Sequence, residues 1–325
     1  MPALIELFPE LEESLPSLRL GTAPTPLRPL SALGGGPAEI WLKDESRFGD
    51  GGWGGNKVRK LEWLIPEAKR RGRSTLLTVG GLGTNWGLAC ALYGREHGLK
   101  TILTLIDQPV DDHVRAQLER LKASGAEIHF THSKAKTIAV VPWLMLRHRP
   151  YYLPAGGSSP VGALGAVEIA LELAAQVDRD EIPAPSHVVT AVGSGGTAAG
   201  LVLGLRLAGL DTKVLAVVVN DTLRLDSPAL LKLAGKSAKL LRERGADLGD
   251  LHLDGNNLIV VDDQLGAGYG HPTPAAREAS ELASERADLE LDPVYTAKAM
   301  AALLEMNDGR LGDRPVVFID TNGPR

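Results

Sequence analysis

The sequence predicts an α/β fold in which mostly parallel strands form twisted sheets flanked by helices. From residue 75 onward, short apolar runs alternate with helical patterns, and the runs are apolar enough for strands buried on both faces. Glycine-rich turns follow several of these runs, which is typical of the carboxyl ends of parallel strands. The length of 325 residues exceeds what one compact core usually holds. It indicates two domains, or one large α/β unit with an insertion.

The expected elements alternate along the chain. Seven apolar runs are expected as strands, at 75–81, 100–107, 126–132, 187–195, 213–220, 258–263 and 315–320. The helical patterns between them are clearest at 111–125, 159–177 and 195–209. Upstream of these elements, the proline-rich segment 22–30 is expected as an extended arm on the surface, because proline restricts its own backbone and that of the preceding residue.

A domain boundary is expected near residue 155. The turn-forming stretch PAGGSSP lies there, and PAPSH precedes the next apolar strand at Val188. We therefore expect residues 1–50 and 156–325 to form a large domain. Residues 51–155 are expected to form a smaller, mobile α/β domain.

Composition argues against several classes of protein. The net charge of −5 leaves no polybasic surface for nucleic acid or an anionic membrane. No continuous apolar run approaches the roughly 20 residues of a membrane span, and the first residues lack the pattern of a secretory signal. Cys90 is the only cysteine, and the eight histidines show no metal-ligand spacing. A cytoplasmic protein without a metal centre is expected.

The turn GSGGT, Gly193 to Thr197, follows an apolar strand and opens an apolar helix. Small residues let the backbone wrap closely, and successive N–H groups at a helix start suit a phosphate. A dinucleotide fingerprint would need glycine where Ala198 stands, and a Walker loop would need a lysine after Gly200. The turn therefore predicts a phosphate site for a ligand other than NAD or ATP, with a plain tight turn as the alternative.

Lys57 stands directly behind a glycine run, at the start of a predicted helix. A helix start disfavours an ammonium group, and partial burial there lowers the pKa of the amine and frees it for imine formation. Lys60, one turn on, can balance a phosphate as a point charge. The alternative is that Lys57 is an ordinary solvated surface lysine. A reactive lysine together with a phosphate turn indicates pyridoxal phosphate as the cofactor.

Five motifs stand in the order found in one family of pyridoxal phosphate enzymes. They are GGNKVRKLEWL, YLPAGGSSPVGALG, VGSGGTAAGL, GAGYGHP and LDPVYTAKAM. The chain thereby resembles the 1-aminocyclopropane-1-carboxylate deaminase / D-cysteine desulfhydrase family, of the tryptophan-synthase-β-like or fold type II enzymes, from about residue 22 to 321. The resemblance implies a two-domain enzyme whose large domain binds the cofactor, and a homodimer.

The resemblance also implies a role for individual residues. Lys57 would bind the cofactor covalently and then move the Cα proton of the substrate. Asn85 would donate a hydrogen bond to the 3′-oxygen of the cofactor, and Thr84 would place a hydroxyl beside the substrate carboxylate. Tyr269 and Tyr295 match the family's active-site tyrosine pair. The phosphate would be held by Lys60 and by the backbone amides of Gly193, Ser194, Gly195, Gly196 and Thr197.

Two further positions bear on the reaction. Ring-opening members of the family carry glutamate facing the pyridine nitrogen, where this chain has the neutral hydroxyl of Thr296. Thr321 likewise resembles the threonine of the desulfhydrase members. Both favour α,β-elimination from a small amino acid such as D-cysteine, with pyruvate, ammonia and sulfide as products. The alternatives are 1-aminocyclopropane-1-carboxylate deamination, an amino-acid racemase or deaminase, and a cofactor-holding protein of low activity.

Two residues depart from the family pattern. Trp86 replaces a histidine, and its indole is expected to change the volume and hydrogen bonding near the mouth of the pocket. Asp320 replaces another histidine at the end of the last strand. It is expected to add negative charge near the cofactor, unless its side chain points away or pairs with a cation. Both substitutions bear on which amino acid is the substrate.

Overall fold

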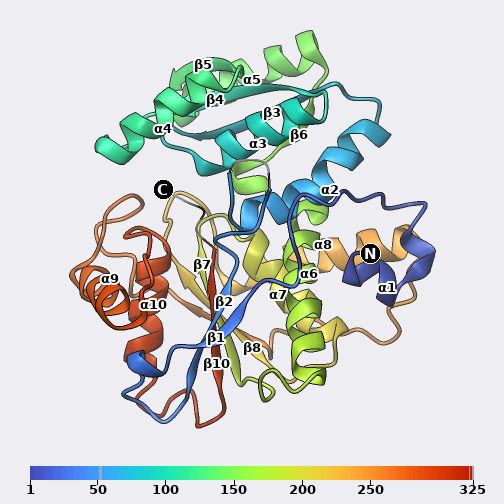
Figure 1. Ribbon diagram of the computed structural model, residues 1–325. Helices are drawn as coiled ribbons and strands as arrows, with labels where there is room; N and C mark the ends of the chain where they lie inside the picture. Colours follow the sequence, from blue (N-terminus) through green and yellow to red (C-terminus); the bar gives the residue numbers. More distant parts are fainter. Residues whose placement is uncertain (51–52, 322, 324–325) are drawn as a thin grey trace.

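The computed structural model describes residues 1–50, 53–321 and 323. Two separate sheets lie one above the other, each with helices against it (Figure 1). The larger sheet has the order β1-β2-β10-β7-β8-β9, and all neighbours are parallel except β1 and β2. Its strands are β1 (Leu27–Pro29), β2 (Ile40–Asp44), β7 (His187–Val192), β8 (Lys213–Val218), β9 (Leu258–Val261) and β10 (Val316–Asp320).

The smaller sheet is parallel throughout, in the order β5-β4-β3-β6. Its strands are β3 (Thr75–Gly81), β4 (Lys100–Ile106), β5 (Glu127–His132) and β6 (Tyr151–Leu153). These strands fall inside the segment 51–155 that the sequence analysis assigns to a small domain. The boundaries of that domain and its mobility stay a prediction.

Helices connect the strands of both sheets. The α-helices are α1 (Ala3–Leu7), α2 (Asn56–Arg70), α3 (Asn85–Glu96), α4 (Asp112–Ala123), α5 (Lys134–His148), α6 (Pro160–Asp178), α7 (Gly196–Leu207), α8 (Ser227–Glu243), α9 (Pro274–Ala287) and α10 (Thr296–Met306). Short 3-10 turns cover Pro9–Leu11, Ser31–Leu33 and Ala155–Gly157. α2 lies between the two sheets in Figure 1 and packs against α6 of the larger lobe and α3 of the smaller one.

All seven predicted strands are present, as are the three clearest helices. Two details differ from the expectation. β5 and β9 are not buried on both faces, because both are edge strands, in which only Thr131 and only Leu258 are buried. The segment 22–30 is not wholly an arm, because β1 within it pairs antiparallel with β2.

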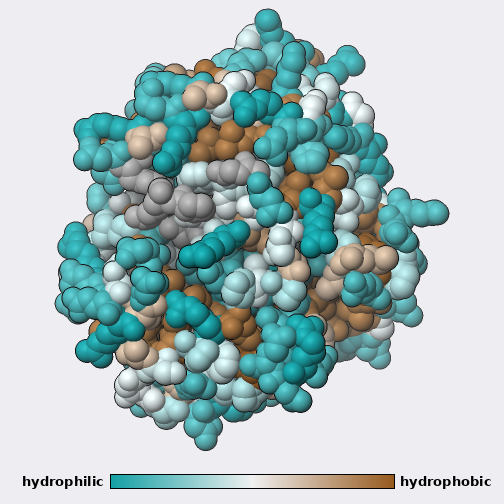
Figure 2. Space-filling model, viewed as in Figure 1, coloured by the Kyte–Doolittle hydropathy of each residue, from teal (hydrophilic) through white to brown (hydrophobic). Residues whose placement is uncertain are grey.

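α6 departs from the expectation that no segment has the length and composition of a membrane span. Among the described residues it is the one helix that passes this test, with 19 residues. However, 83% of its most apolar window is buried inside the protein, as in the core helix of a globular domain. The surface seen in Figure 2 is mostly hydrophilic, with hydrophobic residues in small separated patches.

Buried ion pairs fix α2 on the larger lobe. The Arg59 guanidinium donates to both carboxylate oxygens of Glu45, at 2.9 Å each, and to Glu172 of α6, also at 2.9 Å. Lys43 of β2 donates to Glu172 as well. Burial alone lowers the pKa of Arg59, but the carboxylates of Glu45 and Glu172 outweigh it and raise that pKa above its ordinary value. Because one turn of an α-helix takes 3.6 residues, Arg59 points away from the side that carries Lys57.

Candidate active site

The start of α2 meets the start of α7 and the exit of β10. Asn56 donates through Nδ2 to Thr197 Oγ1 at 2.9 Å, which ties the first residue of α2 to the first turn of α7. A Cβ atom on Gly55 would lie 2.8 Å from the backbone nitrogen of Gly323 and 3.2 Å from the carbonyl oxygen of Thr321. Segments far apart in the sequence therefore converge on the residue before Asn56. Gly51 and Gly52 of the predicted glycine run lie outside the described residues.

Lys57 is the second residue of α2 and is partly buried. Its Nζ donates to Asn56 Oδ1 at 3.0 Å. Burial lowers the pKa of Lys57 from 10.5 to about 8, because the surrounding protein disfavours the charged amine. The neutral amine, which attack on an aldehyde requires, is therefore far more abundant near physiological pH than in an ordinary lysine.

Lys60 lies one turn further along α2 and is fully buried. Its Nζ donates to the carbonyl oxygen of Gly156 at 2.9 Å and stands 3.1 Å from the Cβ position of Gly196. Burial and then the charge of Lys57 lower the pKa of Lys60 well below its ordinary value. No carboxylate within the described part of the chain forms an ion pair with either lysine. One partly buried and one fully buried amine, neither paired with a carboxylate, fit a bound anion such as a phosphate.

The glycine turn forms the wall beside Lys60. Gly195 is the N-cap of α7 with a φ of 87°, a left-handed conformation that favours glycine. The Gly196 N–H donates to Ser158 Oγ at 2.9 Å, and Ser158 Oγ donates to Ser194 Oγ at 2.8 Å. A side chain on Gly196 would collide with Ser158 Oγ, since its Cβ would lie only 2.6 Å away. The turn therefore brings glycine backbone and two serine hydroxyls together at a helix start, which is the chemistry of a phosphate cradle.

The fit to pyridoxal phosphate rests on this neighbourhood. A neutralisable lysine, a second buried lysine and a helix start lined by glycine and serine lie together where α2 meets α7. The first lysine suits an aldehyde, and the second lysine and the helix start suit a phosphate, so together they suit one molecule that carries both groups. The sequence does not identify Ser158 as a site residue, although Ser158 lies in the motif YLPAGGSSPVGALG. Its contact with Ser194 joins residues 36 positions apart, which no local pattern reveals.

The two predicted tyrosines lie together beside the same turn. Their hydroxyl oxygens are 2.5 Å apart, and their rings meet edge to face with centroids 6.0 Å apart. A Cβ atom on Gly193 would lie 2.7 Å from the ring of Tyr295, so this ring packs directly on the turn. Burial raises the pKa of Tyr269 and, together with the neighbouring Tyr269, raises that of Tyr295 well above its ordinary value. Both hydroxyls therefore keep their protons at neutral pH and can donate one.

Thr296 is fully buried as the first residue of α10. Its Oγ1 accepts a hydrogen bond of 2.7 Å from the backbone N–H of Asp292. The Asp292 carboxylate in turn accepts from the N–H groups of Val294 and Tyr295, at 2.8 Å each. Since a hydroxyl has one proton and two lone pairs, Thr296 can still donate that proton to another group.

Thr84 and Asn85 lie at the start of α3, directly after β3. Thr84 is the N-cap, and its Oγ1 accepts from the Gly87 N–H at 3.0 Å. Asn85 Oδ1 accepts from Gln117 Nε2 at 2.5 Å. Within the described residues, no direct hydrogen bond joins Thr84 or Asn85 to Lys57 or Lys60. The structure thus clusters the lysines, the glycine turn and the tyrosines, and places Thr84 and Asn85 on the neighbouring lobe.

Trp86 does not stand at the mouth of a pocket as expected. Its side chain is 3% exposed and donates through Nε1 to Thr78 Oγ1 at 2.8 Å. A Cβ atom on Gly157 would lie 2.6 Å from the indole, so Trp86 packs beneath the loop that carries Ser158. The indole therefore supports the loop from the interior. Asp320 is also buried, at the end of β10, where its carbonyl oxygen accepts from the Glu45 N–H at 3.0 Å.

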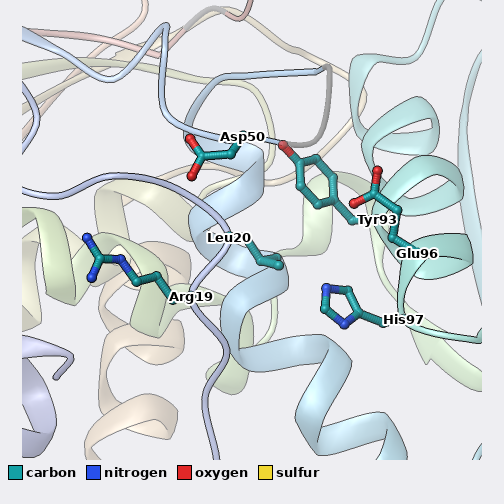
Figure 3. Close-up of a pocket in the computed structure, with 6 residues that line it drawn as sticks. All are labelled: Arg19, Leu20, Asp50, Tyr93, Glu96 and His97. Carbon is teal, nitrogen blue, oxygen red and sulfur yellow. The ribbon is translucent and has the colours of Figure 1, made fainter.

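A separate cavity of about 290 Å³ lies beside the loop that leads to α2 (Figure 3). It is lined by Arg19, Leu20, Asp50, Tyr93, Glu96 and His97, and none of the predicted site residues is among them. At its edge the Tyr93 hydroxyl donates to the carbonyl oxygen of Trp53 at 2.5 Å. This contact attaches α3 to the loop that precedes Lys57.

Solved structures share the whole architecture. The structure of an ACC deaminase homologue has a TM-score of 0.80 and 26% sequence identity, covering 99% of this chain and 95% of that one. A threonine deaminase from T.th. has a TM-score of 0.67 at 21% identity, covering 99% and 97%, and shows the fold alone. Two mostly parallel sheets flanked by helices are thus the fold type II architecture predicted from the sequence.

Sequence relatives agree with the fold. D-cysteine desulfhydrase of Salmonella paratyphi A is 34% identical over 321 residues, covering 95% of this chain and 94% of the relative. The enzyme of the same name from Salmonella newport is 35% identical over the same shares. The family model described as pyridoxal-phosphate dependent enzyme matches residues 18–322. The chain therefore belongs to the pyridoxal-phosphate dependent enzymes, and within them to the family of D-cysteine desulfhydrase that its motifs resemble.

Proposed function

We propose that this protein catalyses α,β-elimination on D-cysteine, with pyruvate, ammonia and sulfide as products. The observation that carries the choice of reaction is the buried hydroxyl of Thr296, held by the N–H of Asp292. In this family that position faces the pyridine nitrogen of the cofactor. The D-cysteine desulfhydrases that are 34–35% identical to this chain over 95% of its length support the same substrate.

The pyridoxal phosphate cofactor supplies an electron sink for the bonds at Cα of the substrate. Lys57 would hold the cofactor at its aldehyde carbon, and its Nζ, which the lowered pKa leaves partly neutral, would take the proton from Cα of the substrate. Lys60 and the backbone amides of Gly193–Thr197 would hold the phosphate. Asn85 would donate its amide to the 3′-oxygen, and the Thr84 hydroxyl would bind the substrate carboxylate.

The tyrosine pair serves the leaving group. As sulfur leaves Cβ of D-cysteine it gains negative charge, and a hydroxyl within reach can stabilise it by donating a hydrogen bond. Tyr269 and Tyr295 share one short hydrogen bond and keep their protons, because burial raises the pKa of both. One of the pair can therefore donate to the sulfur while the other holds it in place.

Thr296 distinguishes elimination from ring opening. A carboxylate at this position would keep the pyridine nitrogen protonated and make the ring a stronger sink. A neutral hydroxyl that donates its proton favours an unprotonated nitrogen and a weaker sink. Elimination tolerates this, because a good leaving group departs as charge develops at Cα. Ring opening of 1-aminocyclopropane-1-carboxylate is the second candidate, supported by the ACC deaminase homologue with a TM-score of 0.80.

The test is a substrate panel on the cofactor-loaded protein. D-cysteine, L-cysteine, D-chloroalanine and 1-aminocyclopropane-1-carboxylate are each incubated with it, and pyruvate, sulfide and 2-oxobutyrate are measured. We expect pyruvate from D-cysteine and D-chloroalanine, and sulfide from D-cysteine. Absence of pyruvate from both D-amino acids refutes the proposal. Production of 2-oxobutyrate alone indicates the ring-opening reaction, and conversion of one enantiomer to the other without pyruvate indicates a racemase.

The alternative to an enzyme is a protein that holds the cofactor and has little catalytic activity. The visible absorption band of the bound cofactor distinguishes the two functions. If no added amino acid shifts this band, no substrate reacts with the cofactor and the protein is not an enzyme of this class. We also propose that the protein is a cytoplasmic homodimer, with residues 51–155 as a mobile small domain. Light scattering on the eluted holoenzyme measures the oligomeric state, and a monomer mass contradicts the dimer.

A further inference from the structure

Gln117 is a buried amide on the inner face of α4, between the buried side chains of Val114 and Leu121. It lies in the middle of α4 and is fully buried, whereas both neighbours on its amino side are exposed. Its Nε2 donates to Asn85 Oδ1 at 2.5 Å, and its Oε1 accepts from the Arg120 guanidinium at 3.2 Å. Both ends of the amide are therefore occupied, one by a charged donor and the other by the predicted cofactor ligand.

The donor at one end fixes the direction of both amides. A guanidinium has only donors, so the oxygen of the Gln117 amide must face Arg120. The NH₂ group of Gln117 then faces Asn85, which in turn must present its oxygen to Gln117. The NH₂ group of Asn85 is left pointing away from Gln117. In this order the charge at Arg120 sets the orientation of the Asn85 amide through the amide of Gln117.

The same arginine contacts the loop before Lys57. Its guanidinium stands 5.6 Å from the ring centroid of Trp53, within the range of a cation–π contact. Trp53 is also held through its carbonyl oxygen, which accepts from the Tyr93 hydroxyl at 2.5 Å. Arg120 therefore lies between the loop that leads to Lys57 and the amide that leads to Asn85.

We infer that Gln117 is a positioning residue that turns the NH₂ group of Asn85 toward the 3′-oxygen of the cofactor. This inference rests on the proposed role of Asn85 as the ligand of that oxygen. The 3′-oxygen carries negative charge when it is ionised, so a donor stabilises it and a carbonyl oxygen repels it. Without Gln117 the Asn85 amide could turn over, since its two ends have nearly the same shape.

Two substitutions of similar size separate orientation from packing. Gln117→Glu keeps the shape of the side chain, but its carboxylate only accepts hydrogen bonds. Asn85 then turns its NH₂ group toward this carboxylate and its oxygen toward the cofactor. Gln117→Met fills the space without imposing a direction. The measurement is the dissociation constant of pyridoxal phosphate from the apo-protein, followed by quenching of tryptophan fluorescence. Thermal unfolding of each apo-protein shows that the variants are folded.

We expect Gln117→Glu to weaken cofactor binding about tenfold or more, with a smaller loss for Gln117→Met, because a hydrogen bond becomes a repulsion only in the first. If Gln117→Glu binds as tightly as the wild type, or Gln117→Met binds more weakly than Gln117→Glu, the inference is wrong.

Asn85→Ala keeps the two proposals apart. If this variant binds the cofactor like the wild type, the proposed role of Asn85 fails, and the inference about Gln117 with it. If Asn85→Ala weakens binding while Gln117→Glu does not, only the inference about Gln117 fails. In the Asn85→Ala background we expect Gln117→Glu to have no further effect. A second loss of similar size there means that Gln117 acts without Asn85 and overturns the inference.

Discussion

The lowered pKa of Lys57 gives the sharpest test of the site. Burial lowers it from 10.5 to about 8. At pH 7 an amine with a pKa of 8 is roughly 9% neutral, whereas an ordinary lysine amine is about 0.03% neutral, a gain of roughly 300-fold in the reactive form. The nucleophilicity of Lys57 toward an uncharged reagent should therefore level off about two pH units or more below the range of ordinary lysines.

Trace labelling of the apo-protein with acetic anhydride between pH 6 and 11 measures this directly. The extent of acetylation of the Lys57 peptide is read by mass spectrometry, with the exposed Lys239 in the same sample as the reference for the reagent. The side chain of Lys239 is 75% exposed. We expect the labelling of Lys57 to rise about tenfold per pH unit, to bend near pH 8 and then to stay constant.

A labelling curve for Lys57 that keeps rising through pH 10 contradicts the reasoning, because the amine would then be as strongly solvated as an exposed one. Lys57→Met removes the labelled peptide signal and confirms the assignment. After loading with pyridoxal phosphate and reduction with borohydride, the adduct should lie on the same peptide. An adduct on another lysine would show that Lys57 is not the residue that binds the cofactor covalently.

The other charged groups of α2 give three more tests. Lys60→Met should weaken binding of pyridoxal phosphate about 10- to 100-fold and leave the affinity for pyridoxal, which lacks the phosphate, unchanged; equal losses for both ligands contradict a phosphate contact. Arg59→Met leaves Glu45 buried without its cationic partner and leaves Glu172 paired with Lys43 alone, so it should lower the free energy of unfolding by about 3–5 kcal/mol in denaturant titrations. A loss below about 1 kcal/mol means that the network relaxes. Burial raises the pKa of Glu62 from 4.5 to about 8, so its contribution to stability is complete below pH 4.5 and is lost as the pH rises through 8. The loss is about 5 kcal/mol at most, and Glu62→Gln should remove it; parallel stability curves for variant and wild type refute this.

Five of the seven strands that the sequence predicts lie inside the sheets and are buried by their own apolar side chains, and the other two, β5 and β9, are edge strands. β3, β4, β7, β8 and β10 are central or long, and their runs are visible without any knowledge of their neighbours. β1 and β6 were not predicted, because three residues are too few to show a period. β2 was missed for another reason, since it buries Lys43.

Burial of Lys43 depends on a partner that lies far along the chain. Its amine is enclosed by Glu172 of α6, 129 residues away, and by Gln176. A charged residue in a short apolar run argues against a buried strand when the sequence does not show which residue will pair with it. The same reason hid Ser158 and Gln117, whose partners lie 36 and 32 residues away. The motif residues, by contrast, could be named from the sequence because each motif is local.

The positively charged side chains on the two sides of α2 differ in whether a carboxylate pairs with them. Arg59 is enclosed by two carboxylates, which hold its pKa above the ordinary value despite burial. Lys57 is partly buried and Lys60 is fully buried, and burial lowers the pKa of both, because no carboxylate of the described residues is paired with them. A helix that needed these lysines only for stability would gain from pairing them as it pairs Arg59, since an uncompensated buried charge is destabilising. The unpaired side therefore carries a cost that an anionic ligand removes, and it faces the glycine turn at the start of α7, where such an anion fits.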